Sequence, residues 1–152
     1  MTGASAFSAS PAFLVYAMTG VVLSLNLLTL WVASGLVRAR GGVAINPEDG
    51  IRFGARVSEL DPPDVARYLR AHRNAEATIY PFLALGLIYI LAGGGAAAAI
   101  LIFAVFVVAR IAHSVFYLKA VQPWRTIAFA ASLLTIAALI LALAIVLLTR
   151  AL

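Results

Sequence analysis

Long apolar stretches dominate the chain and recur four times between short polar segments. They predict helices over residues 13–37, 66–92, 96–118 and 126–148. Each stretch is close to the ~20 residues that an α-helix needs to cross a hydrocarbon layer of ~30 Å. The pattern therefore predicts an all-α membrane protein, in which residues 1–152 form one domain, an up-and-down bundle of four transmembrane helices.

The connections between these stretches differ in length and polarity. Residues 38–65 contain several glycines and prolines and charges of both signs, so we expect a polar loop outside the lipid. Asp64 is the expected N-cap of the second helix. Three glycines at 93–95 form a short, uncharged connection between the second and third helices, and residues 119–125 connect the third helix to the fourth.

The composition excludes an ordinary soluble domain, because 64% of the residues are hydrophobic and only 11% are charged. The formal net charge of +5 would point to a nucleic-acid partner in a soluble protein. Here nine of the eleven Lys and Arg lie in the two connections on one side, seven within residues 38–73 and two at Lys119 and Arg125. The positive-inside rule makes that side cytoplasmic and both termini non-cytoplasmic, and we expect no nucleic-acid partner.

Ionisable side chains at membrane depth are costly and usually face the interior of a bundle, where they mark functional sites. In the third helix Arg110, His113 and Tyr117 are spaced i, i+3 and i+7. At about 100° per residue they lie on one stripe about 60° wide. One interpretation is a binding site. The alternative is an internal ion pair, Arg110 with Glu76 of the neighbouring helix, that only holds the bundle together.

The second helix carries a comparable stack of polar residues, Arg70, Arg73 and Asn74. These arginines, with Arg67, would also serve as an anchor for phospholipid headgroups. We favour a site for a polyanionic small molecule at the cytoplasmic end of the bundle, because guanidinium groups pair bidentately with carboxylates. No group of His, Asp and Glu has metal-ligand spacing, so no metal site is expected.

Three sequence motifs together resemble a known family. They are Asn46-Pro47-Glu48-Asp49, Leu69-Arg70-Ala71-His72-Arg73-Asn74 running into Thr78-Ile79-Tyr80-Pro81-Phe82-Leu83, and Arg110-Ile111-Ala112-His113 with Tyr117. The chain resembles, over essentially its whole length, the membrane-associated proteins in eicosanoid and glutathione metabolism (MAPEG), and especially the branch that isomerises prostaglandin endoperoxides. The resemblance implies a homotrimer of four-helix bundles that binds glutathione between subunits near the cytoplasmic face.

The resemblance also assigns roles to residues of this chain. The glutathione-binding set comprises Arg38, Arg70, Arg73, Asn74, Glu76, Arg110, His113 and Tyr117. Glu76 precedes by one position the place of a family glutamate, which is Ala77 here. Asp49, Arg125 and Thr126 fall at positions implied in catalysis, and Phe129 stands in place of a tyrosine. A hydroxyl and a fixed cation would help a bound thiol to ionise.

These observations predict a glutathione-dependent membrane enzyme of transferase, isomerase or peroxidase type. The thiolate of the bound glutathione would attack a lipophilic electrophile or peroxide that arrives through the membrane lipids. The alternative is a non-catalytic membrane scaffold or a lipid-binding protein that retains the fold. Alanine and arginine are abundant and lysine occurs once, which is typical of GC-rich bacterial genomes. We therefore expect the bacterial inner membrane, or the endoplasmic reticulum in a eukaryote, with the active site toward the cytoplasm.

Overall fold

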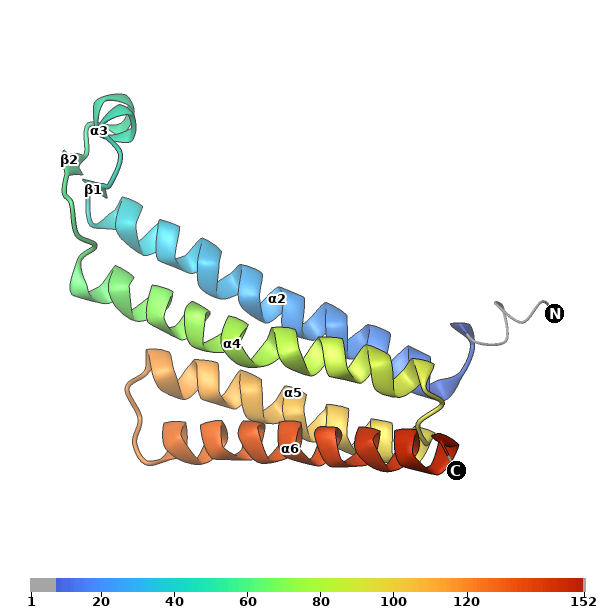
Figure 1. The fold of residues 1–152 in the computed structure, drawn as a ribbon. Helices are drawn as coiled ribbons and strands as arrows, with labels where there is room; N and C mark the ends of the chain where they lie inside the picture. The colour runs from blue at the N-terminus through green and yellow to red at the C-terminus, as the bar shows by residue number, and fades with distance from the viewer. Residues whose placement is uncertain (1–7, 152) are drawn as a thin grey trace.

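The computed structural model describes residues 8–151, and four long helices run side by side through it (Figure 1). They are α2 (Pro11–Arg40), α4 (Pro63–Leu91), α5 (Ala96–Leu118) and α6 (Trp124–Ala151). Within this part of the chain, these four helices are long and apolar enough to cross a membrane. The predicted four-helix architecture is confirmed. Of the predicted domain 1–152, residues 1–7 and 152 lie outside the described residues.

α2 and α6 extend beyond their predicted spans at both ends and α4 begins three residues early, whereas α5 has its predicted bounds. α2 begins at Pro11, where a missing N–H costs nothing, and the Ser10 side chain accepts a hydrogen bond from the Phe13 backbone N–H at 3.2 Å. The predicted N-cap of α4 is wrong. That helix already begins at Pro63, with Pro62 in the cap position, so Asp64 lies in its first turn.

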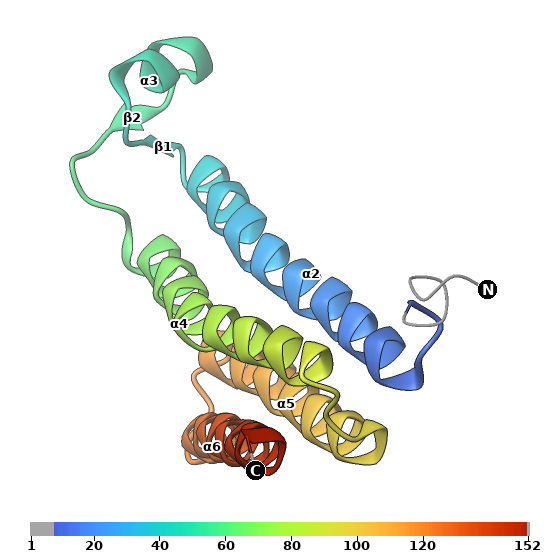
Figure 2. The same cartoon turned by 45° about the vertical axis from the view of Figure 1, so that its right-hand side comes forward.

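The segment between α2 and α4 is not the plain loop that we expected. It contains the short helix α3 (Pro47–Phe53) between two strands, β1 (Val43–Ala44) and β2 (Arg56–Val57), which pair in parallel. We call residues 41–62 the head. Figures 1 and 2 show it standing beyond the end of the bundle. Gly54 ends α3 in the left-handed conformation, at φ 62°, which favours glycine.

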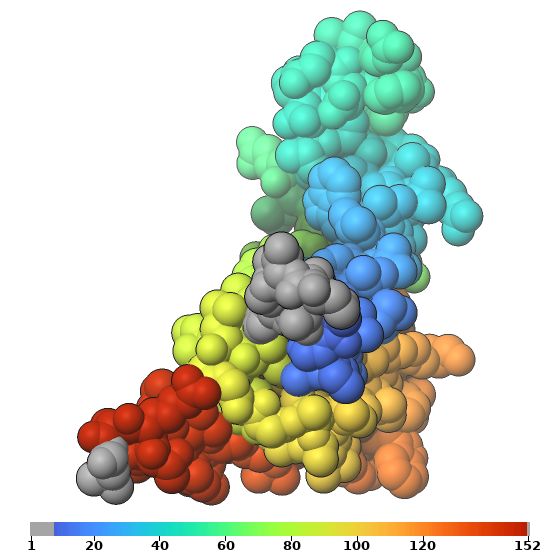
Figure 3. All heavy atoms as spheres, turned by 90° about the vertical axis from the view of Figure 1, so that its right-hand side faces the viewer, coloured from blue at the N-terminus to red at the C-terminus, as the bar shows by residue number. Residues whose placement is uncertain are grey.

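The bundle is open rather than closed into a square. α2 packs on α4 and α5, and α6 packs on α5 and α4, whereas α2 and α6 do not contact each other (Figure 2). At the end away from the head, Figure 3 shows the start of α2 (blue), the hairpin between α4 and α5 (yellow) and the C-terminal part of α6 (red). The first and last described turns therefore lie at the opposite end from the head, as an up-and-down bundle requires.

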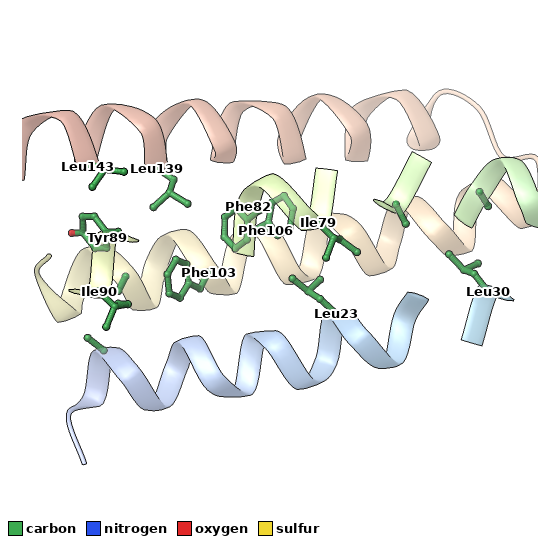
Figure 4. Close-up of a cluster of buried hydrophobic side chains, with 14 residues drawn as sticks. Leu23, Leu30, Ile79, Phe82, Tyr89, Ile90, Phe103, Phe106, Leu139 and Leu143 are labelled. Atoms are coloured by element: carbon green, nitrogen blue, oxygen red, sulfur yellow. The ribbon is translucent and has the colours of Figure 1, made fainter. Parts of the chain in front are cut away.

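The core follows α5 through most of its length (Figure 4). Phe82 of α4 stacks on Phe106 of α5, with ring centroids 3.6 Å apart, and meets Phe103 edge-on. Leu23 of α2 and Leu139 of α6 close this aromatic cluster from its two sides and are fully buried. Because the outer faces of α2 and α6 remain lined with exposed leucines, those faces are suited to lipid or to another apolar surface.

Candidate functional site

A polar pocket opens between α4, α5 and α6 at the end of the bundle nearest the head. Its volume is about 250 Å³. The residues that line it are Asn74, His113, Tyr117, Arg125, Thr126 and Phe129. All except Phe129 belong to the set of site residues predicted from the sequence. The structure thus brings together side chains from three helices, although Asn74 and Phe129 lie 55 positions apart in the chain.

Arg110 is fully buried next to this pocket. Its side chain has no exposed surface, and its Nη2 donates a hydrogen bond to Asn74 Oδ1 at 3.1 Å. Among the described residues, its Nε and Nη1 have no partner. A buried cation with spare donors supplies positive charge to whatever lies in the pocket.

The alternative ion pair between Arg110 and Glu76 is wrong. The Glu76 carboxylate instead lies 3.4 Å from His72 Nδ1 and accepts a hydrogen bond from the Tyr80 hydroxyl at 3.2 Å. The reason is rotation along α4. Glu76 follows Asn74 by two positions, or about 200° around the helix, and so faces away from α5.

His113 is held in a defined orientation. It is 3% exposed, and its Nδ1 lies 3.0 Å from the backbone oxygen of Arg125. Because a carbonyl oxygen only accepts hydrogen bonds, Nδ1 is the donor. The imidazole packs against the rings of Tyr117 and Phe129, with centroids 5.7 and 5.5 Å away. Its Nε2 is buried and has no partner within residues 8–151, so it is available to a ligand.

Arg125 and Thr126 lie in the first turn of α6 and line the pocket. The guanidinium carbon of Arg125 is 5.1 Å from the centre of the Tyr117 ring, a cation–π geometry that restrains the long side chain. The N-terminus of a helix carries a partial positive charge. A guanidinium and a hydroxyl therefore converge at the positive end of the α6 dipole, where an anion would be stabilised.

Other predicted residues lie outside the polar pocket of a single chain. Arg38 and Asp49 line a second pocket of about 350 Å³ between the end of α2 and the head. There Arg38 Nε contacts Asp61 Oδ1 at 2.7 Å, and Asp49 accepts a hydrogen bond from the Asn46 amide at 3.0 Å.

Three predicted residues of α4 also remain outside the pocket. Arg70 and Arg73 are exposed, and Glu76 bonds to Tyr80. The stripe on α5 and the first turn of α6 thus form a site within one chain. The remaining residues lie toward the same end of the bundle, and the glutathione-binding and catalytic roles of all these residues, inside and outside the pocket, stay predictions.

A model of the MAPEG family matches residues 16–145. The chain belongs to the MAPEG family. It is similar to prostaglandin E synthase from Homo sapiens, with 38% identity over 130 residues, 85% of this chain and 86% of the relative. The corresponding enzyme of Equus caballus is 40% identical over 134 residues, 88% of this chain and 86% of its own length. Microsomal glutathione S-transferase 1 from Homo sapiens is 35% identical over 122 residues, 77% of this chain and 79% of that protein.

Membership of the MAPEG family confirms the resemblance that the motifs indicated. Together with the four apolar helices, it makes the chain an integral membrane protein. The geometry adds one residue that the sequence analysis missed. Gln122, in the connection before α6, lies 3.0 Å from the Thr126 hydroxyl. Gln122 lies three positions before Arg125 and four before Thr126, a spacing that places side chains next to each other where the chain turns as a helix, so the sequence did indicate this contact.

Proposed function

We propose that this MAPEG protein is a glutathione-dependent membrane enzyme whose polar pocket binds and activates the tripeptide. The observation that carries the proposal is the convergence of Arg125 and Thr126, from the first turn of α6, in one pocket beside the buried cation of Arg110. Two similar proteins are named prostaglandin E synthase and microsomal glutathione S-transferase 1, and the second name itself contains glutathione.

The chemistry depends on ionising a thiol. A cysteine thiol of ordinary pKa, about 8.5, is mostly protonated at neutral pH, and only the thiolate is a strong nucleophile. The chain has no cysteine, so the sulfur has to come from a bound molecule. In the proposed complex, the Arg125 guanidinium and the Thr126 hydroxyl stabilise the glutathione thiolate, and Asn74, His113 and Tyr117 hold the rest of the tripeptide.

The acceptor is proposed to be a lipophilic electrophile or peroxide that arrives from the bilayer. An apolar groove of about 450 Å³ lies between α5 and α6 and includes Val108, Phe116 and Trp124. Because Trp124 directly precedes Arg125, this surface brings an apolar molecule close to the proposed thiolate. The groove is lined almost entirely by hydrocarbon, so it favours an apolar class of acceptor without selecting one member.

We further propose that the enzyme is a homotrimer with this site toward the cytoplasm. Five predicted site residues lie toward the end of the bundle that holds the polar pocket but do not line the pocket of one chain: Arg38, Asp49, Arg70, Arg73 and Glu76. This is consistent with a site completed between neighbouring copies. The basic residues gathered at this end support the cytoplasmic orientation. Native mass spectrometry in mild detergent should show three copies, and a monomer would contradict the assembly.

The function is tested by turnover with purified protein. The panel contains glutathione with a chlorodinitrobenzene, a lipid hydroperoxide and a prostaglandin endoperoxide, each also assayed with the Arg125→Ala variant. We expect glutathione-dependent turnover of at least one acceptor, lowered in the variant. Absence of turnover with all three, in protein that is folded and trimeric, would favour the non-catalytic scaffold instead.

A further inference from the structure

We propose that Gln122 is a positioning residue that aims both the Arg125 guanidinium and the Thr126 hydroxyl at the glutathione sulfur. The inference rests on the proposed function of the polar pocket. Gln122 lies in the connection between α5 and α6 and does not line the pocket itself. It therefore acts through the two residues that do.

The orientation of the Gln122 amide follows from its neighbours. A guanidinium carries only donors, so the amide atom that faces Arg125 has to be the oxygen. In that orientation Oε1 accepts from Arg125 Nη2 at 2.6 Å and from Nε at 3.1 Å, and Nε2 donates to Thr126 Oγ1 at 3.0 Å. One neutral side chain thus bonds to both proposed catalytic groups at once.

This arrangement decides where the Thr126 proton points. A hydroxyl has one hydrogen to donate. Because Thr126 Oγ1 accepts a hydrogen bond from Gln122, its own hydrogen remains available for the thiolate in the pocket. With the opposite amide orientation, the Thr126 hydroxyl would donate its hydrogen to Gln122 Oε1 instead. The amide therefore keeps Thr126 a donor toward the sulfur.

The same amide fixes Arg125 without cancelling its charge. The guanidinium donates two hydrogen bonds to Gln122 Oε1 and lies 5.1 Å from the centre of the Tyr117 ring, so it is restrained from separate directions. Three of its five N–H donors are left for a ligand. A carboxylate at position 122 would hold the guanidinium equally well but would neutralise the positive charge that stabilises a thiolate.

The backbone places Gln122 for this role. It precedes Pro123, and the first turn of α6 begins there, with Arg125 N–H bonded to Val121 O at 3.1 Å and Thr126 N–H to Pro123 O at 2.9 Å. Gln122 therefore reaches one helical turn forward to its i+3 and i+4 neighbours. Since Gln122 is exposed, water competes for these bonds, and we expect effects of several-fold rather than complete loss of activity.

The decisive substitution is Gln122→Glu, which preserves shape and the acceptor for Arg125 but accepts from Thr126 and adds a negative charge. The readout is the ultraviolet absorbance of the bound glutathione thiolate, titrated against pH. We expect the midpoint to rise by about one pH unit, with kcat lowered about three- to tenfold and glutathione affinity changed less than about threefold. Gln122→Leu removes all three hydrogen bonds without adding charge and should lower kcat with a smaller shift of the midpoint.

The matched control is Lys119→Gln, an exposed residue of the same connection. It changes the net charge by the same amount, and within residues 8–151 no hydrogen bond or ion pair joins its side chain to Arg125 or Thr126. A midpoint and kcat for Gln122→Glu that equal those of this control would overturn the inference while leaving the proposed function standing. A wild-type protein that binds no glutathione, or binds it without forming thiolate, would overturn the proposed function and this inference with it.

Discussion

The hydrogen bond between Arg110 and Asn74 offers a stability test that needs no substrate. Arg110 is fully buried between helices, and Asn74 Oδ1, 3.1 Å from Nη2, is its one hydrogen-bond partner within the described chain. Substituting Asn74→Ala removes that partner and leaves a buried cation unpaired. The reverse logic also holds. Removing both groups, with Arg110→Met and Asn74→Ala together, leaves no unpaired charge.

The magnitude follows from the burial. A hydrogen bond to a charged group contributes about 1.5–3 kcal/mol to the free energy of unfolding, and a buried charge left without its partner adds a desolvation penalty. We therefore expect Asn74→Ala to lower the free energy of unfolding by about 2–3 kcal/mol. The double variant should be destabilised by at least about 1 kcal/mol less than the sum of the single changes, since the two groups act as a pair.

The assay is equilibrium unfolding in mixed micelles of a mild detergent and SDS, without glutathione, followed by helical circular dichroism. Asn46→Ala is the control, because Asn46 is exposed in the head and its side chain, among the described residues, bonds only to Asp49, while its backbone bond from Gly50 N–H is kept in the variant. The reasoning is refuted if Asn74→Ala matches this control within about 0.5 kcal/mol, or if the effects of the two single changes simply add.

Three further changes test other parts of the structure. Ala120 has φ 57°, so Ala120→Gly should raise the free energy of unfolding by about 0.5–1 kcal/mol in the same assay, and a decrease would contradict the left-handed turn. A Cβ added at Gly50 would collide with the side chain of Val57, so Gly50→Ala should loosen the head and speed its cleavage by protease; unchanged cleavage would contradict the packing. Asp61→Asn removes the ion pair with Arg38, in which the Arg38 side chain is 27% exposed and the Asp61 side chain 19%. It should lower the free energy of unfolding by at most about 1 kcal/mol, and by less at high salt. A larger or salt-independent loss would contradict a solvent-screened pair.

The transmembrane helices were predictable because an apolar stretch of this length has a single solution in lipid. The exact ends of these helices were less predictable: α4 begins at Pro63, one residue before the expected cap Asp64. The head was missed because its strands have only two residues each and exist through pairing across the chain, such as Arg56 N–H with Gly42 O at 2.8 Å. A helix over 47–53 was nevertheless encoded, by a proline at its start and a left-handed glycine at its end.

Within the site, helical periodicity correctly placed His113 and Tyr117 in one pocket, since that follows from a single helix. It did not identify the partner of Arg110. Choosing Asn74 over Glu76 depends on how α4 is rotated against α5, and side-chain packing sets that rotation. For the same reason, the role inferred for Gln122 depends on the three-dimensional structure at the start of α6, which helical periodicity does not specify.

The central claim is that the polar pocket holds glutathione and that Arg125 acts on its sulfur. The most direct measurement is a calorimetric glutathione titration, with turnover measured on the same preparations of wild type, Arg73→Ala and Arg125→Ala. Arg73→Ala should weaken binding about ten- to hundredfold, as expected for a lost charge-assisted hydrogen bond. Arg125→Ala should bind within a few-fold of wild type but show a lowered kcat, because its interaction strengthens in the transition state. Small and equal effects of both substitutions on affinity and turnover would contradict the claim.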